Sequence, residues 1–208
     1  MNKSLITPAL STPTLQHIEQ VSEGWINKYI LTYRMPNGST YAYESISRKK
    51  LAAYTREMQR DPTAPQTADA ISIVGRTADD ELVMIKEFRY PLNSWCIAFP
   101  AGLIDPGEDM MACVERELLE ETGYGLRMVD GGPCVRPLEQ PGCSSTGLSE
   151  ESVCTVFAEV EKRGDAQPEP AELIEAFTLP ISDIDTFLKA NTLPIGTRCQ
   201  LVLEGLRR

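Results

Sequence analysis

The sequence has 208 residues, 42% of them hydrophobic, and 30 acidic residues against 20 basic ones give it a formal net charge of -10. This length fits one domain, or one domain with a small accessory piece, and can bury a sizeable core. The acidic balance argues against broad nucleic-acid binding by charge attraction. No apolar segment reaches the length of a signal peptide core or a membrane span. We therefore expect a cytoplasmic protein with no nucleic-acid partner and no membrane association.

The first half of the chain predicts mainly strands. After a polar N-terminal arm, residues 25–48 alternate in polarity and turn at Pro36-Asn37-Gly38, as β-hairpins do. Residues 49–65 then predict a short basic helix followed by a proline-rich link, and the role of the segment Lys49–Arg60 is open. Three further strands are predicted at residues 69–77, 81–91 and 94–99.

The second half predicts helices around two more strands. A helix is expected at residues 108–122, between Pro106-Gly107 and a stop at Gly123. After it we expect strands at 151–161 and 171–180, a helix from an N-cap at Ser182 to about Ala190, and a terminal helix at 196–208. This order of elements favours an α+β fold in which helices cover a mixed sheet.

The cysteines and the histidine exclude some kinds of site. The six cysteines are scattered, mostly within apolar runs and without a C-x-x-C pair: Cys96, Cys113, Cys134, Cys143, Cys154 and Cys199. They favour reduced core residues over a disulfide framework. The single histidine, His17, lies in the N-terminal arm, which argues against a histidine-based metal site or catalytic triad.

The end of the predicted helix is acidic where a helix favours cations. Residues 114–124 read VERELLEETGY, and each carboxylate near the negative pole of the helix costs up to about 1 kcal/mol. At about 100° per residue, Glu117, Glu120 and Glu121 share one face, next to an apolar stripe that includes Leu118. Oxygen ligands at this density suit Mg²⁺ or Mn²⁺. Taken alone, the run favours a solvated acidic face over a metal site.

The residues around the acidic run form a longer pattern. From Gly102 to Tyr124 the sequence fits G-x5-E-x7-R-E-U-x-E-E-x-G-U, where U is a bulky apolar residue. Here the chain resembles the Nudix hydrolase family, whose signature is this stretch, although Tyr124 stands where an aliphatic residue is more usual. The resemblance implies the Nudix fold, a mixed β-sheet sandwiched between helices. It also implies an enzyme that uses Mg²⁺, or Mn²⁺, to hydrolyse a nucleoside diphosphate linked to another group.

The resemblance also implies roles for individual residues of this stretch. The implied metal ligands are Glu117 and Glu121, with Glu120 beside them and the carbonyl of Ala101 as a further ligand. Arg116 and Glu108 would orient these carboxylates. The expected catalytic residues of this stretch are Arg116 and Glu120. A purely structural salt bridge between Arg116 and Glu108 is compatible with that role.

The flanking segments FRYP, FPAGLIDPGE and QPGCSSTGLSEES resemble the ADP-ribose pyrophosphatase branch of the family. This implies that residues 1–66 form an arm and an antiparallel β piece, exchanged between protomers of a homodimer, with a role in dimerisation and substrate binding. Residues 67–208 would form the Nudix domain. The expected reaction cleaves ADP-ribose into AMP and ribose 5-phosphate. The alternatives are a GDP-sugar or UDP-sugar hydrolase and a non-catalytic ligand-sensing domain, and the intact signature argues against the latter.

The branch implies four substrate-binding residues. Trp25 and Tyr43 would sandwich the adenine, where stacking contributes about 1–3 kcal/mol per base, although packing across the hairpin is an alternative role. Arg48 and Arg89 match arginines that contact the diphosphate or the terminal ribose phosphate, a task that suits the bidentate guanidinium group.

The general base is expected on the loop before the last strand. The family pattern maps best onto residues 171–175, which makes Glu172 the first choice and Glu169 the second. An ordinary acidic loop is the other interpretation. The chain departs from the branch at two positions: Ala98 stands where glutamate is common, and Pro141 lies 18 residues beyond Gly123, where the branch has a proline about 16 beyond.

Overall fold

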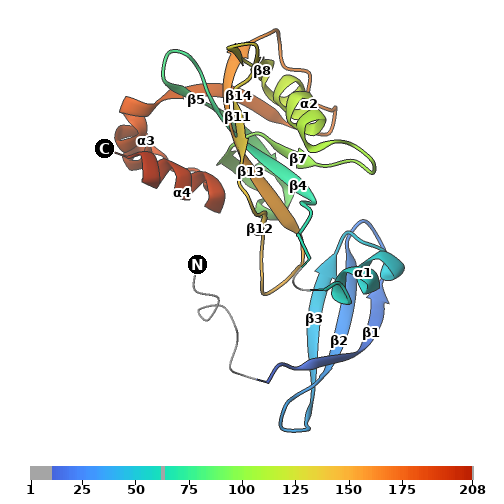
Figure 1. Cartoon of the computed structure of the whole chain (residues 1–208). Coiled ribbons are helices and arrows are strands. Elements are labelled where there is room, and N and C mark those ends of the chain that lie inside the picture. Colours follow the sequence, from blue (N-terminus) through green and yellow to red (C-terminus); the bar gives the residue numbers. More distant parts are fainter. Residues whose placement is uncertain (1–10, 62–63, 208) are drawn as a thin grey trace. The chain divides into compact units, whose positions relative to one another are not determined.

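The computed structural model describes residues 11–61 and 64–207, and Figure 1 shows the chain. The chain forms two compact units. The first unit runs to Pro65 and also takes in Cys143–Glu151. The second unit consists of Gln66–Gly142 and the chain from Ser152 onward. The segment Cys143–Glu151 is thus grouped with the N-terminal part of the chain, from which it is distant in sequence.

The first unit is a small antiparallel sheet with one helix. The strands β1 (Thr14–Ser22), β2 (Asn27–Arg34) and β3 (Thr40–Ser47) pair in the order β1-β2-β3, and the helix α1 (Leu51–Met58) follows. The predicted hairpin is confirmed, because β2 and β3 are joined by a turn in which Gly38 has a φ of 83°. Only a residue without a side chain adopts that backbone conformation at no steric cost.

The strand β1 corrects the prediction that this stretch is only a polar arm. It pairs with β2 along most of its length, but the register shifts twice, between Leu15 and His17 and between Gln20 and Ser22. Each shift breaks the alternation of apolar and polar residues. Most of its side chains are exposed at the sheet edge, so the hydrophobic pattern that marks a strand is missing.

The segment Lys49–Arg60, whose role the sequence left open, closes the small core of the first unit. Tyr54 of α1 is buried and stacks on Tyr29 of β2, with ring centroids 4.2 Å apart. The Tyr54 hydroxyl donates a 2.8 Å hydrogen bond to the Ser45 hydroxyl. At the start of β2, the buried Asn27 amide donates to the carbonyl of Ser47 at 3.2 Å. The helix therefore covers one end of a sheet that could not bury its own face.

The second unit is built on a mixed sheet with the strand order β11-β13-β4-β5-β14. The parallel pairing of β13 with β4 makes it mixed. Its main strands are β4 (Ala70–Arg76), β5 (Glu81–Arg89), β6 (Ser94–Ala98), β7 (Ala101–Leu103), β8 (Tyr124–Leu126), β11 (Val135–Pro137), β13 (Ser152–Lys162) and β14 (Ile174–Pro180). The short strands are β9 (Met128–Val129), β10 (Gly132–Pro133) and β12 (Gly142–Cys143).

Helices cover both faces of this sheet (Figure 1). On one face, α2 (Met110–Thr122) packs through Val114 and Leu118 against Val83 and the inward residues of β13. On the other face, α3 (Ile184–Ala190) and α4 (Thr197–Leu206) pack against β4, β5 and β6. The arrangement confirms the predicted α+β class and a mixed sheet between helices.

The predicted strands and helices of this unit are found with shifts of a few residues at their ends. The predicted N-cap at Ser182 is wrong. The chain leaves β14 in a 3-10 turn, Ile181–Asp183, in which Ile181 is buried, and α3 starts only after Asp183. The Ser182 hydroxyl donates to the Asp183 carboxylate at 3.0 Å instead of capping a helix. No helix in residues 11–61 and 64–207 is long and apolar enough to cross a membrane.

The cysteines follow the prediction in part. None of the six, which all lie within the described residues, forms a disulfide bond, and four of them are buried in the second unit: Cys96, Cys113, Cys154 and Cys199. Cys134 and Cys143 are exposed, because Cys134 lies between the short strands β10 and β11 and Cys143 ends the exposed two-residue strand β12.

Candidate active site

The helix α2 carries two glutamates on its buried face. Glu117 and Glu121 are only 9% and 4% exposed, beside the fully buried Val114 and Leu118. Asp109 caps the start of the helix, because its side chain accepts a hydrogen bond from the Met111 N–H at 2.8 Å, and no basic residue lies in the last turn. The burial of these two carboxylates contradicts a solvated acidic face.

The strand β7 holds the two carboxylates through its backbone. The Ala101 N–H donates a 3.0 Å hydrogen bond to Glu121 Oε2. At Gly102 the backbone passes so close that an added Cβ would lie 1.8 Å from Glu117 Oε1. A residue without a side chain is therefore needed at position 102 to leave room for the Glu117 carboxylate.

Arg116 ties the acidic residues of α2 to the loop that precedes it. Its Nε and Nη2 donate to the two oxygens of Glu108 at 2.9 and 3.0 Å. Its Nη1 donates to Glu117 at 2.6 Å and to Glu120 at 3.3 Å. The hydrogen bonds from Arg116 are the main reason why the pKa of Glu108 falls to about 2. The geometry brings Arg116, Glu108, Glu117 and Glu120 together, and it fits a residue that orients carboxylates.

Arg116→Lys is expected to lower the free energy of unfolding by about 1–3 kcal/mol, because lysine cannot reproduce the planar fork that holds Glu108 and Glu117. Urea unfolding followed by circular dichroism measures the change. Arg163→Lys is the matched control, since Arg163 meets Glu161 at 2.7 Å on the surface and both side chains are over 40% exposed. Equal losses in the two variants would contradict the positioning role of Arg116.

Negative charge accumulates around the buried pair. The pKa of Glu121 is raised to about 8, mainly by burial and also by the charges of Glu117, Glu87 and Glu172, while the hydrogen bond from Ala101 acts in the opposite direction. Burial also raises the pKa of Glu117, where the bond from Arg116 opposes it. Carboxylates that are buried together in this way are stabilised by a bound cation.

Glu87 also belongs to this group, although it lies outside the motifs that predict the site from the sequence. It lies on β5 with its side chain 16% exposed, and Arg89 Nη1 donates to it at 2.9 Å. Burial is the main cause that raises its pKa, and Glu172 adds to the effect. The sequence contains the information needed to find Glu87, because every second residue of a strand points to the same face. Glu87 therefore shares a face of β5 with Val83, Ile85 and Arg89, and Val83 packs on the α2 side.

Both candidates for the general base lie in one tight turn before β14. The Glu172 N–H donates to the Glu169 carbonyl at 2.8 Å, and Glu172 Oε2 accepts from the Glu169 N–H at 3.2 Å. Glu172 is among the charges that raise the pKa values of Glu87, Glu117 and Glu121. Glu172 therefore adds to the negative charge that acts on these three carboxylates.

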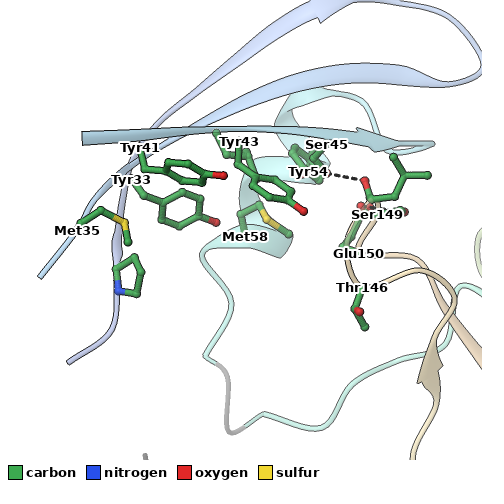
Figure 2. Close-up of a pocket in the computed structure, with 13 residues that line it drawn as sticks. Tyr33, Met35, Tyr41, Tyr43, Ser45, Tyr54, Met58, Thr146, Ser149 and Glu150 are labelled. Carbon is green, nitrogen blue, oxygen red and sulfur yellow. Dashed lines mark hydrogen bonds between the residues drawn. The ribbon is translucent and has the colours of Figure 1, made fainter. Parts of the chain in front are cut away.

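The expected adenine-binding residues lie in the first unit. Tyr43 is 38% exposed and its hydroxyl donates to the Gly147 carbonyl at 2.8 Å. Tyr43 lines a groove of about 400 Å³ together with Tyr33, Tyr41 and Met58, and Figure 2 shows these side chains gathered along it.

Trp25 lies elsewhere in the same unit. It is 75% exposed and does not line this groove. It precedes Asn27, which pairs with Ser47, whereas Tyr43 pairs with Leu31, so Tyr43 is about 13 Å along the sheet from Asn27. The structure does not bring Trp25 and Tyr43 together within one chain.

The two expected phosphate-binding arginines both have acidic partners. Arg48, in the first unit, forms an ion pair with Glu151. Arg89, in the second unit, pairs with Glu87 and so stands next to the acidic group. Ala98, at the position where glutamate is common, lies on β6 opposite Ile85 and carries no polar atom toward this group.

The carboxylates of Glu117 and Glu121 fit a divalent cation whose remaining ligands are waters and substrate phosphates. In residues 11–61 and 64–207, no three His, Cys, Asp or Glu side chains stand close enough together to form a ready-made metal cluster. Mg²⁺ commonly takes one or two protein carboxylates and fills its octahedron with waters and substrate phosphates. Glu117 and Glu121 supply such a pair, and the backbone of β7 adjoins it.

Comparisons with known proteins identify the family to which a site of this kind belongs. The NUDIX domain model matches residues 66–196. ADP-sugar pyrophosphatase from Mus musculus is 35% identical over 183 residues, which cover 83% of this chain and 75% of that protein. ADP-ribose pyrophosphatase from Saccharomyces cerevisiae is 29% identical over 201 residues, with 92% and 81% covered.

A solved structure shares the fold. The crystal structure of an ADP compounds hydrolase matches with a TM-score of 0.69 over 95% of this chain and 94% of its own, at 20% sequence identity. The family match, the 35% identical relative and the signature residues gathered around α2 lead to one conclusion. The chain belongs to the Nudix family and is a Nudix hydrolase.

Proposed function

We propose that the protein hydrolyses the diphosphate bond of ADP-ribose, with Mg²⁺ or Mn²⁺, and releases AMP and ribose 5-phosphate. The observation that carries the proposal is the buried pair Glu117 and Glu121, set against the backbone of Ala101 and Gly102. The names of the relatives, an ADP-sugar pyrophosphatase and an ADP-ribose pyrophosphatase, support the substrate class.

The residues around the pair would divide the work as follows. Glu117 and Glu121 would hold the divalent cation, with Glu120 and the Ala101 carbonyl as further ligands. When bound, the cation neutralises the diphosphate and makes water a stronger acid. Arg116 keeps Glu117 and Glu120 oriented, since one guanidinium nitrogen contacts both. A ligand set held in this way loses little entropy when the substrate arrives.

Glu172 would take the proton of the attacking water. Its Oε2 accepts from the Glu169 backbone, so Oε1 is the oxygen left for the water proton. The turn that joins Glu169 to Glu172 fixes the start of the loop, and β14 fixes its end at Ile174. Because Glu172 lies on this short loop, its carboxylate can be brought within hydrogen-bond distance of the water.

The substrate-binding residues suggest a homodimer. Trp25 and Tyr43 do not meet within one chain, and both expose much of their rings. We infer that Trp25 of one protomer and Tyr43 of its partner enclose the adenine, while Arg48 and Arg89 contact the phosphates. Arg89 is already oriented by Glu87, and a phosphate would compete for the same guanidinium group.

Glu172→Gln is expected to slow hydrolysis at fixed pH by about a hundredfold to ten-thousandfold, with metal affinity almost unchanged. The amide cannot accept the proton, whereas the proposed metal ligands are untouched. Single-turnover kinetics and Mn²⁺ titration measure the two quantities. Glu169→Gln is the matched control from the same turn and should keep near wild-type rates. A loss confined to Glu169→Gln would assign the base to Glu169.

A small substrate panel tests the proposed function itself. With Mg²⁺ present, ADP-ribose should be turned over faster than a GDP-sugar or a UDP-sugar, and AMP and ribose 5-phosphate should be the products seen by chromatography. Preferential release of GMP or UMP would replace ADP-ribose by the corresponding nucleotide sugar. Binding of ADP-ribose without turnover would support the ligand-sensing alternative and contradict the proposal.

A further inference from the structure

The second unit contains a cavity that the proposed hydrolysis does not use. It has a volume of about 400 Å³, within the usual range for small-molecule sites. Its floor is apolar and includes Val74, Phe157 and Leu206, and its rim carries Arg76 and Arg136. Val74 and Phe157 belong to the face of the sheet that α3 and α4 cover, whereas the acidic residues of α2 belong to the opposite face.

The strand register builds this cavity from two neighbouring rows of residues. In the first row, Arg136 of β11 lies opposite Phe157 of β13, and Phe157 lies opposite Val74 of β4. In the second row, Glu159 lies opposite Arg76. Residues paired in this way point to the same face of a sheet. The helix α4 ends at Leu206, so the outer part of this face is left open beside it.

The charged side chains at the rim of the cavity differ in whether they have an ion-pair partner. Arg76 pairs with Asp80 at 2.5 Å, and Glu159 pairs with Arg127. Within the described ranges, Arg136 forms no ion pair, and its guanidinium group instead lies over the Phe157 ring, 4.7 Å from the centroid. In a protein with a net charge of -10, a cation held on an aromatic ring above an apolar floor is complementary to a single negative charge.

We propose that this cavity binds a small amphipathic carboxylate, with an aromatic or branched aliphatic body and one anionic group at its edge. The body would lie on Phe157, Val74 and Leu206, and the carboxylate would accept hydrogen bonds from the fork of Arg136. A nucleoside diphosphate fits this site poorly, because its several charges would lie on the apolar floor next to Glu159.

The experiment uses 2-naphthoate as the probe and 2-naphthamide as its neutral counterpart, titrated calorimetrically into the full-length protein. The expected result is saturable binding of the carboxylate, with the amide bound about tenfold more weakly or worse. Arg136→Gln should weaken naphthoate binding by about the same factor and abolish the preference over the amide. The matched control Arg163→Gln replaces an exposed arginine that does not line the cavity and should bind like the wild type.

Two further measurements locate the bound naphthoate and check that the variant is folded. Amide chemical-shift changes on adding naphthoate should centre on Val74 and Phe157, and circular dichroism should show that Arg136→Gln is folded. Absence of saturable binding, equal affinity for acid and amide, or unchanged binding in Arg136→Gln would overturn the proposal. A change of sedimentation coefficient in Arg136→Gln without naphthoate binding to the wild type would assign this face to a second copy of the chain instead.

Discussion

Glu121→Gln should reduce hydrolysis by about a thousandfold or more, because it weakens the binding of a cation that contributes several kcal/mol of charge stabilisation in the transition state. The amide has nearly the same shape and can still accept the hydrogen bond from the Ala101 N–H. The fold should therefore persist, and the metal-free variant should be as stable as the wild type or more so. Steady-state kinetics and thermal unfolding measure the two effects.

Glu115→Gln is the control for this variant. Glu115 lies on the same helix but is exposed, so its loss removes the same formal charge without touching the buried pair. Its rate should stay within a few-fold of the wild type. Undiminished turnover in Glu121→Gln would contradict the role of this carboxylate in catalysis.

The same residue gives the metal-free protein a pH dependence. The pKa of Glu121 in the folded chain is raised from 4.5 to about 8. The folded state therefore holds the proton more tightly than the unfolded state, and stability falls as the pH rises from about 4.5 through 8. With a chelator present, the slope of stability against pH should be clearly smaller in Glu121→Gln than in the wild type, while Glu115→Gln should keep the wild-type slope.

Gly102→Ala should reduce hydrolysis by about a hundredfold, the cost of moving a catalytic group by about 1 Å. The new Cβ would lie 1.8 Å from Glu117 Oε1, so the carboxylate must move away from its place beside Arg116. The loss of stability should be small, because the atom that clashes is the end of a flexible side chain. Kinetics at saturating Mg²⁺ and substrate measure the effect.

Gly132→Ala is the matched control, since an added Cβ at Gly132 meets no heavy atom within 4 Å. It should leave the rate unchanged. A Gly102→Ala enzyme with wild-type turnover would show that the position of the Glu117 carboxylate is not critical.

The sequence was most informative where one motif fixes both local structure and chemistry. The stretch from Gly102 to Tyr124 predicts a helix with an acidic face and a glycine before it. The structure explains both, since Glu117 fills the space that a side chain at position 102 would occupy. The α+β fold followed from the hydrophobic pattern of β4, β5 and β13, whose long apolar runs leave little ambiguity.

Structural features that depend on long-range contacts could not be predicted from the sequence. The strand β1 is held by pairing with β2 and shows no clear alternation of its own. The segment Cys143–Glu151 joins the first unit through long-range contacts such as the 2.8 Å bond from Tyr43 to Gly147. Such contacts join residues about a hundred positions apart and have no local signature. Glu87 could have been found, because the period of β5 places it on the same face as Val83.

The most direct test is a titration with Mn²⁺ followed by electron paramagnetic resonance, on the wild type, Glu117→Gln, Glu121→Gln and Glu115→Gln. The two buried glutamates are expected to hold the cation, so Glu117→Gln and Glu121→Gln should lose most of the bound Mn²⁺ signal while Glu115→Gln keeps it. Mn²⁺ binding that is equally tight in all four proteins would show that the buried pair on α2 does not hold the metal.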